Sequence, residues 1–372
     1  MLEDLSKLSE REHQSLHHPI PEELLKQDMN FDHSSPHEIR GYQRRILTGM
    51  RPSGSLHLGH YAGALKNWLE MEDRFHCTFL IADLHAFADN SDRPQFVRDC
   101  TMEVALDWLA VGLDPHKADF VVQTGVPELE NLTVLFETLV PLSDLQGNPT
   151  LKAELATLKD SRRTVSFHNY PVSEAADILG PRGDVVPAGD DQRPMIELTR
   201  RIARKVNDQF LAGKNFKLPL PQIYTGAVGR LRGTDGKSKM GKSLHNTIEL
   251  NLPSKELKKR VNGLSSPVKP MEEPGIIEGH LVFEYLDAFH PDSAELATLK
   301  ADYQKGGIGE GHLKQMLYRD LDQLLEPIRE RRKTFESNPD YVRDVLHQGT
   351  KNVRSIVQAT LGEVREAMGF FR

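Results

Sequence analysis

The chain of 372 residues is 38% hydrophobic and 27% charged, proportions that are ordinary for a soluble enzyme. Its net charge of −7 excludes a wholly basic nucleic-acid coat, so RNA binding would need local basic patches. Cys77 and Cys100 are the only cysteines, which excludes a disulfide framework and a cysteine zinc site and fits a reducing cytoplasm. Because no apolar run reaches transmembrane length and no signal segment opens the chain, we expect a cytoplasmic protein that does not associate with membranes.

Residues 1–40 differ in composition from the rest of the chain. They are polar and mixed in charge, and the spacing of their histidines matches no defined metal site. Their acidic residues argue against a mitochondrial transit peptide. We therefore predict a flexible or loosely docked extension and no metal site.

The organising stretch begins after this extension. Residues 44–49 predict a short buried strand, 50–54 a turn rich in Gly and Pro, and a helix begins near Leu56. The first turn of this helix carries His57, Gly59 and His60. A helix N-terminus attracts phosphate, two imidazoles three residues apart face the same way, and a glycine lets a ligand approach the backbone. The pattern predicts a phosphate-binding turn.

Strands and helices then alternate. Residues 77–83 predict a buried parallel strand followed by the polar Asp83 and His85, 94–112 an amphipathic helix, and 119–123 a third strand. This βαβ order predicts an α/β fold with a doubly wound parallel sheet. Residues 126–168 are mainly helical and interrupt the alternation, so we interpret them as an insertion whose apolar positions are either core or a dimer surface.

The second half of the sheet is predicted to begin at a short strand over 184–187. Gly189, Asp190 and Asp191 follow it, and a glycine beside carboxylates suits the hydroxyls of a ribose. The same aspartates could equally cap the helix predicted over 192–206. From residue 254 onward the pattern is helical, and Asn338 with Pro339 is a good start for the last helix. The exposed cations of this region are either solvated or a local patch for an RNA backbone.

A second motif, Lys239-Met240-Gly241-Lys242-Ser243, follows the predicted nucleotide fold. An early HLGH and a later KMxKS-like loop together resemble the class I aminoacyl-tRNA synthetases. The chain from 44 to 370 is similar to the bacterial-type tryptophanyl-tRNA synthetases. The segments that carry this resemblance are GMRPSGSLHLGHYAGAL, IADLHAF, LAVGLDP, YPVSEAADIL, VPAGDDQRPMIELTRRIARKVN, KMGKS and the final helices.

The resemblance implies a Rossmann-like catalytic domain over 41–235, with the insertion at about 126–168, and a helical tRNA anticodon-binding region over 236–372. It implies that L-tryptophan is activated with ATP to an adenylate and then transferred to tRNA(Trp), by an enzyme that is a homodimer. Mg²⁺ is expected to arrive with ATP rather than in a dedicated protein site.

The resemblance also implies the site residues. The catalytic set would be His57, His60, Lys239 and Lys242, with the lysines neutralising charge on the departing pyrophosphate. The ATP-binding set would be Arg51, Pro52, Ser53, Gly59, His60, Gly189, Asp191, Gln192, Lys239, Met240, Gly241, Lys242 and Ser243. The tryptophan-binding set would be Leu47, Gly49, His85, Tyr170, Asp177, Ile178 and Gln192, with Asp177 accepting the indole N–H and Tyr170 contacting the head group of the amino acid.

Several positions depart from the family pattern. Gly241 replaces a serine and is expected to add backbone freedom, Leu47 and Thr48 replace an aromatic residue and a serine, and Arg51 replaces a glutamine. Arg51 could pair with the carboxylate of the substrate. Glu174 falls where an apolar or amide residue is usual, so it should point outward or meet a cation.

The alternatives are a tyrosyl-tRNA synthetase, a small nucleotidyltransferase, a tRNA-binding regulator without catalysis, or an auxiliary copy of the tryptophan enzyme. AADIL after Tyr170-Pro171 favours tryptophan over tyrosine, and the long helical C-terminal region argues against a small nucleotidyltransferase. The presence of HLGH and of both lysines argues against a regulator.

Overall fold

The computed structural model of the chain describes residues 44–158, 163–225, 231–267 and 269–371. The extension predicted over 1–40 lies outside these residues. Within the described part of the chain, no helix is long and apolar enough to cross a membrane.

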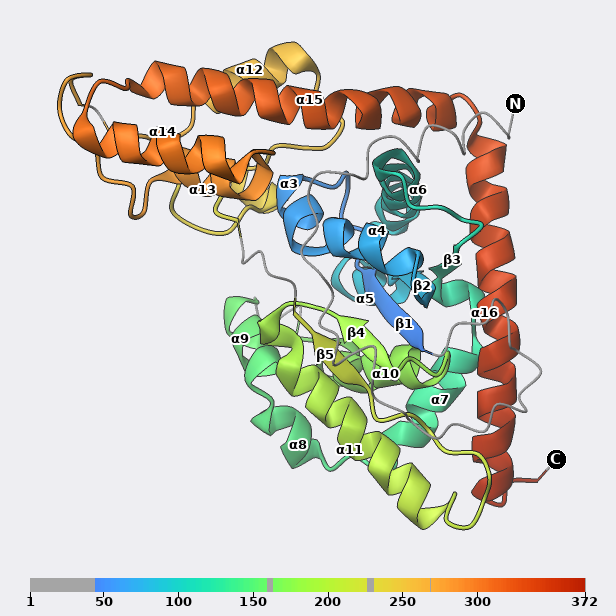
Figure 1. Cartoon of the computed structure of the whole chain (residues 1–372). Coiled ribbons are helices and arrows are strands. Elements are labelled where there is room, and N and C mark those ends of the chain that lie inside the picture. Colours follow the sequence, from blue (N-terminus) through green and yellow to red (C-terminus); the bar gives the residue numbers. More distant parts are fainter. Residues whose placement is uncertain (1–43, 159–162, 226–230, 268, 372) are drawn as a thin grey trace.

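The centre of the fold is one sheet of five parallel strands in the order β3-β2-β1-β4-β5 (Figure 1). The strands are β1 (Arg45–Met50), β2 (His76–Ile81), β3 (Ala118–Val122), β4 (Val185–Pro187) and β5 (Gln222–Tyr224). All six residues of β2 are buried, which explains its unbroken apolar sequence. The doubly wound parallel sheet is therefore confirmed, and each predicted strand lies within two residues of its expected bounds; β5 was not predicted.

The first half of the sheet carries the two helical regions that the sequence predicts, near Leu56 and over 94–112, together with α5 and η2, which it does not predict. They are α3 (Leu58–His60), the π-helical turn η1 (Tyr61–Leu65), α4 (Lys66–Glu72), α5 (Asp83–Asp89), α6 (Pro94–Val111) and the 3₁₀ turn η2 (Gln123–Gly125). Gly112 ends α6 with a φ of 113°, a left-handed conformation that favours glycine. Trp68 and Trp108 meet edge-on between α4 and α6, with ring centroids 5.6 Å apart, and tie these helices to the buried side of β2.

The segment after β3 is mainly helical, as the sequence predicts. It contains α7 (Glu128–Glu137), α8 (Leu142–Gly147), α9 (Pro149–Thr157) and the start of α10 (Val165–Leu179). Thr164 caps α10 by accepting a hydrogen bond from the N–H of Phe167. Helix α10 packs against α7 and against α11 (Arg193–Gln209), which follows the 3₁₀ turn η4 (Asp190–Gln192).

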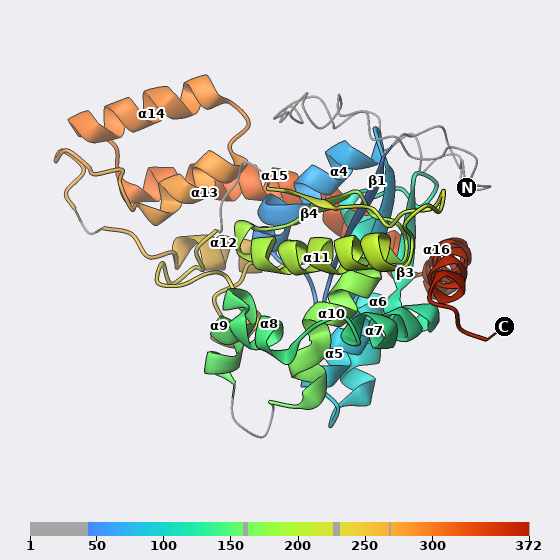
Figure 2. The same cartoon turned by 90° about the horizontal axis from the view of Figure 1, so that it is seen from below.

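The remaining helices are η5 (Lys242–Leu244), α12 (Ser254–Asn262), α13 (Leu281–Phe289), α14 (Ser293–Lys305), α15 (Glu310–Glu336) and α16 (Pro339–Ala367). Helix α16 starts at Pro339, as predicted. Helices α12–α14 form a lobe with the first part of α15, whereas α16 lies on the opposite side of the molecule beside β3 (Figures 1 and 2).

Gly349 shows why α16 can lie so close to the sheet. A Cβ atom at this position would lie 2.3 Å from the carbonyl oxygen of Phe120 in β3. Beside it, Asn352 donates to a carboxylate oxygen of Asp119 at 2.8 Å. The end of the chain therefore packs on the sheet itself, and the division into a catalytic and a helical domain stays a prediction.

Candidate active site

The sheet positions the site where its strand order reverses. Strands β1 and β4 are neighbours whose connections leave in opposite directions, so their carboxyl ends open into a crevice, the usual ligand position in such sheets. The sequence places Arg51 after β1, His85 after β2, Gln123 after β3 and Gly189 after β4. Residues that follow four strands therefore lie at the same edge of the sheet.

The two sequence motifs meet at the turn after β1. Gly54 has a φ of 107°, and its carbonyl oxygen accepts a hydrogen bond from the ammonium group of Lys242 at 2.7 Å. The hydroxyl of Ser53 lies 3.4 Å from the same Nζ atom. The structure thus brings together residues 188 positions apart in the chain. Among the neighbours of this turn, Pro52 and Leu56 are buried.

The histidines of HLGH stack at the start of α3. Their ring centroids are 3.8 Å apart, and the backbone N–H of His57 donates to Nδ1 of His60 at 3.2 Å. Burial lowers the pKa of His57 to about 4 and that of His60 well below its usual value, and the charge of Lys242 adds to both shifts. Both rings are therefore neutral at pH 7, where each offers one N–H donor. A Cβ on Gly59 would lie 3.0 Å from the His57 ring, so glycine allows this stack.

The KMGKS loop is held by polar contacts at Gly241. Its backbone N–H donates to the side-chain oxygen of Asn246 at 2.8 Å, and Asn246 in turn donates to the carbonyl of Lys239 at 3.3 Å. Gly241 has a φ of −159°, which any residue adopts, so this backbone does not require glycine. Met240 is buried in the core, Lys239 is exposed and Lys242 is half-buried. Of Ser243 only the backbone is described.

Asp177 lies on α10 and contacts Gln123, the residue after β3. It is only 2% exposed, and both of its carboxylate oxygens accept hydrogen bonds from the side-chain amide of Gln123, at 3.0 and 2.8 Å. Burial raises the pKa of Asp177 well above its usual value, and the bond from Gln123 opposes that shift. The ring Nε2 of His85 lies 3.6 Å from Asp177 and 2.9 Å from the hydroxyl of Ser173. Burial lowers the pKa of His85 to about 3, so this ring is neutral.

Gln123 is a residue that the sequence reasoning missed. The sequence predicts Gln123 as the last residue of the third strand and indicates no functional role for it. The available signal was a polar side chain directly after an apolar strand, at the same sheet edge as His85.

Tyr170 of α10 lies next to both Arg51 and His85. The guanidinium carbon of Arg51 lies 4.6 Å from the centre of the Tyr170 ring, within range of a cation–π interaction. Arg51 also pairs with Asp89 at 3.4 Å and with Glu154 of α9 at 3.9 Å. Burial raises the pKa of Glu174 to about 7, and the charge of Arg51 opposes this. The expectation that Glu174 points outward or meets a cation stays a prediction.

Three other predicted residues lie on β1 and α10. Leu47 and Ile178 are buried in one small cluster with Val186 and Ile196, on the same side of β1 as Gly49. A Cβ on Gly49 would lie 2.2 Å from the carbonyl oxygen of Leu80, so only glycine fits there.

After β4, the structure separates the two aspartates whose roles the sequence left open. Asp190 pairs with Arg193 at 2.7 Å from the 3₁₀ turn η4, but neither aspartate caps α11 as the alternative expected, because its N-cap is Gln192 and its first turn holds no acid. Asp191 instead accepts a hydrogen bond from the amide of Gln192 at 2.9 Å. A Cβ on Gly189 would lie 2.5 Å from Asp191 Oδ1, so the glycine lets this carboxylate fold back over the backbone.

Known proteins resemble this chain in sequence and in fold. A family model described as tRNA synthetases class I (W and Y) matches residues 41–326. The chain belongs to this family. The tryptophan–tRNA ligases of Clostridium longisporum and Lactococcus lactis are each 42% identical to it, over 87% of this chain and 96% and 97% of theirs. A crystal structure of tryptophanyl-tRNA synthetase from Campylobacter jejuni, complexed with ADP and tryptophan, matches with a TM-score of 0.77 and 31% identity, covering 88% of this chain and all of that one.

Membership in this synthetase family confirms the predicted class of enzyme and agrees with the meeting of HLGH and KMGKS. Within the described residues, no group of three His, Cys, Asp or Glu side chains could hold a metal ion. The groups that surround the phosphate turn are neutral imidazoles and cations, whereas those around Asp177 are amide, imidazole and phenol. The candidate site therefore combines a cationic end at Lys242 with a buried acceptor, Asp177, among polar and aromatic groups.

Proposed function

We propose that this chain is a tryptophan–tRNA ligase that joins tryptophan to AMP with release of pyrophosphate and then transfers the tryptophanyl group to tRNA(Trp). One observation carries the assignment of the site. Lys242 reaches the turn after β1 at the same sheet edge where Gln123 orients a buried carboxylate. The side at Lys242 suits ATP and the side at Asp177 suits tryptophan, the two substrates of the first step.

On the phosphate side, ATP would lie against the turn at residues 52–57 and the start of α3. Neutral His57 and His60 would donate N–H groups to phosphate oxygens, because their low pKa values keep a ring nitrogen available without adding charge. Lys242, which donates to Gly54, would move to the β- and γ-phosphates as negative charge develops on pyrophosphate, and exposed Lys239 would join it. Gly189, Asp191 and Gln192 would hold the ribose. Mg²⁺ carried by ATP supplies further neutralisation of the phosphates.

On the other side, the indole ring would lie over the surface made by Gly49, Leu47 and Ile178. Indole N–H is only a donor, and Asp177 is an acceptor whose orientation Gln123 fixes. Tyr170 and Arg51 would meet the head group, with Arg51 pairing with the carboxylate that attacks the α-phosphorus. Holding both substrates in line supplies most of the acceleration, since no covalent nucleophile is required.

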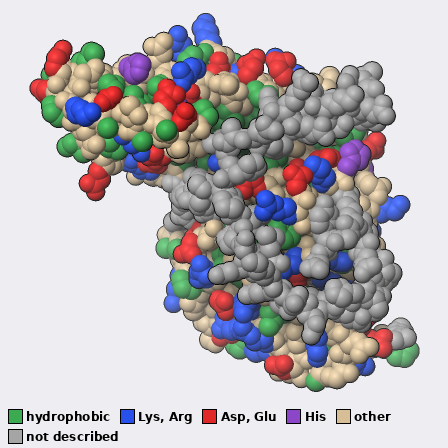
Figure 3. Space-filling model, viewed as in Figure 1, with side chains coloured by type: hydrophobic (Ala, Val, Ile, Leu, Met, Phe, Trp, Pro, Cys, Tyr) green, Lys and Arg blue, Asp and Glu red, His purple; other side chains and the backbone are tan. Residues whose placement is uncertain are grey.

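Two surfaces support the proposed macromolecular partners. Helix α11 carries exposed Arg193, Arg201 and Arg204, and these cations suit a tRNA backbone. Figure 3 shows Lys and Arg side chains together with acidic ones over this part of the surface. Exposed apolar side chains gather on the insertion and the start of α10: Val134 is 58%, Leu142 62% and Val165 86% exposed. A second copy of the chain would cover them in a homodimer. A cytoplasmic location completes the proposal, and the buried free thiols of Cys77 and Cys100 fit a reducing compartment.

Exchange of pyrophosphate into ATP tests the activity directly. We expect exchange with tryptophan and not with tyrosine or phenylalanine, followed by charging of tRNA(Trp). Exchange with tyrosine alone would instead favour the tyrosyl enzyme, and no exchange with any amino acid would contradict the assignment.

A further inference from the structure

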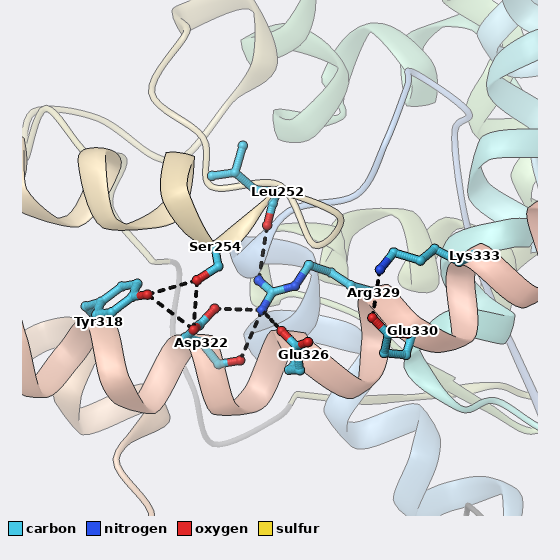
Figure 4. A network of polar contacts seen from close by, with 8 residues as sticks. All are labelled: Leu252, Ser254, Tyr318, Asp322, Glu326, Arg329, Glu330 and Lys333. Carbon is cyan, nitrogen blue, oxygen red and sulfur yellow. Dashed lines mark hydrogen bonds and ion pairs between the residues drawn. The ribbon is translucent and has the colours of Figure 1, made fainter.

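Helix α15 connects parts of the molecule that meet at the ATP side of the site. Its first part packs against α12 and α13, and its last part packs against α6. Figure 4 shows one connection, where Arg329 donates to the carbonyl of Leu252 at 3.1 Å and pairs with Asp322 at 2.6 Å. Leu252 lies just beyond Leu250, whose N–H donates to the carbonyl of Leu56 at 2.9 Å. The segment that continues from the KMGKS loop is thus tied to both α15 and the phosphate turn.

Arg332, three residues after Arg329 on α15, makes the second connection. It is 4% exposed and pairs with two acids of α6: its Nη2 lies 2.7 Å from Glu103, and its Nη1 contacts Asp107, which is fully buried. Its Nε donates to Glu336 at 2.7 Å. Three carboxylates therefore occupy the planar fork of one guanidinium, which fixes the direction of each.

The two acids of α6 hold the phosphate turn. Asp107 accepts a hydrogen bond from the backbone N–H of Leu56 at 2.6 Å, and Glu103 accepts one from the hydroxyl of Ser55 at 3.0 Å. These residues lie between Gly54, the acceptor for Lys242, and His57 at the start of α3. The position of the turn therefore depends on carboxylates that Arg332 orients.

The same acids act on Lys242. Burial lowers the pKa of Lys242, while Cys100, Asp107, Glu249 and Glu103 act in the opposite direction by stabilising its charge. Burial raises the pKa of Asp107 to about 6, and Arg332 is the strongest influence against that rise. Without Arg332, the pKa of Asp107 would rise further, so this acid would take up a proton and lose the pairing that fixes it at the turn.

We propose that Arg332 is a positioning residue for adenylate formation, which fixes Glu103 and Asp107 so that they hold the phosphate turn where its Gly54 carbonyl receives Lys242. The inference rests on the proposed role of this turn and of Lys242. It predicts that replacing Arg332, which lies in the helical region and touches no substrate, changes the rate of the chemical step.

The chain offers a matched control in Arg331. This neighbour also joins α15 to α6, but it donates to backbone carbonyls, that of Ala110 at 2.6 Å and that of Val111 at 3.2 Å. We expect R332Q to lower kcat of tryptophan-dependent pyrophosphate exchange by about tenfold to a hundredfold, with the KM for tryptophan unchanged, because small misplacements of a site cost such factors. R331Q should stay within about twofold of wild type. If R332Q does not fold, R332K decides the question, since lysine keeps the charge and loses the fork.

Three further variants, R332Q/D107N, K242A and R332Q/K242A, distinguish a loss of positioning from a loss of stability. Asp107→Asn keeps an oxygen that accepts the hydrogen bond from the N–H of Leu56. R332Q/D107N should therefore recover part of the kcat that R332Q loses. Lys242→Ala should cost less in the R332Q background than in wild type, because the turn that receives Lys242 is already displaced there.

A lower melting temperature for R332Q with wild-type kcat, or equal kcat losses in R331Q and R332Q, would overturn the inference. Additive effects of R332Q and K242A would do the same. If K242A alone leaves exchange unchanged, the proposed role of the loop fails instead, and the two failures are distinguishable.

Discussion

The amide nitrogen of Gln123 lies 3.0 Å from one carboxylate oxygen of Asp177 and 2.8 Å from the other. One donor shared by both oxygens fixes the plane of the carboxylate and stabilises its charge in a buried place. Each oxygen still has a free lone pair, so Asp177 can accept a further hydrogen bond from a ligand. Gln123 therefore prepares the acceptor, and Asp177 receives the indole N–H in the proposed complex.

Asp177→Ala is predicted to weaken tryptophan activation by about ten- to a hundredfold, the value of a charged hydrogen bond of about 1.5–3 kcal/mol. An analogue whose ring nitrogen is replaced by carbon or sulfur should lose little, because it has no N–H to bind. The measurement compares kcat/KM for pyrophosphate exchange with both substrates. Equal losses on both would mean that Asp177 supports the fold and does not read the indole.

Replacement of Lys239 or Lys242 by Ala is predicted to lower the maximal activation rate by roughly a hundredfold or more, as when a preorganised charge stabiliser is removed. The affinity for ATP should change far less, because most of the charge develops in the transition state. Single-turnover formation of the adenylate measures both quantities. A normal maximal rate with weaker ATP binding would instead identify a clamp for the ground state.

How much of this site could be predicted from sequence depends on the range of each interaction. HLGH and its turn are local: the glycine pattern and the helix start lie within one short segment, and the segment forms as predicted. Lys242 was recognised by its motif, but its bond to Gly54 depends on a fold that brings distant segments together. Contacts such as Arg332 with Asp107 leave no periodic signal at all, since an arginine on a helix usually faces water.

The loop around Gly241 shows a second limit of structure prediction from sequence. Glycine suggested backbone freedom from its intrinsic preferences, yet its amide is bonded to Asn246 and its φ is extended. Tertiary hydrogen bonds decide its conformation. Strand β5 escaped prediction for a related reason: three half-buried residues are too short for a periodic pattern, and pairing with β4 defines them.

Arg51 and Glu174 are predicted to make tryptophan binding depend on pH near neutrality. The pKa of Glu174 is raised to about 7, mainly by burial, so Glu174 gains its charge as the pH rises through that value. The new charge competes with the substrate carboxylate for Arg51, and the KM for tryptophan should rise about three- to tenfold between pH 6 and 8.

Two variants test this competition. Glu174→Gln should flatten the profile, and Arg51→Gln should raise KM at both pH values. A KM that falls as the pH rises would show that Glu174 binds the ammonium group of the substrate instead.

Glu72, far from the site, is predicted to make folding stability fall as the pH rises from about 5 to 8. It is 3% exposed at the end of α4 and accepts a hydrogen bond from the N–H of Asp114 at 3.0 Å. Burial raises its pKa from 4.5 to about 8, so the folded chain retains a proton that the unfolded chain has already lost. The folded state therefore binds more protons than the unfolded state throughout this window. Through Glu72 alone, each unit of rising pH lowers the free energy of unfolding by about 1.4 kcal/mol.

Glu72→Gln keeps the acceptor for Asp114 and removes the titration, so at pH 8.5 it should exceed wild type in stability by a few kcal/mol relative to their difference at pH 5. Urea unfolding at both pH values measures this change. Asp184→Asn is the matched control: the pKa of Asp184 is raised only to about 6, so its difference from wild type should be constant between pH 7 and 8.5. If the curves of wild type and Glu72→Gln run parallel from pH 5 to 8.5, Glu72 is ionised in the folded protein, and an interaction other than its bond to Asp114 must stabilise its charge.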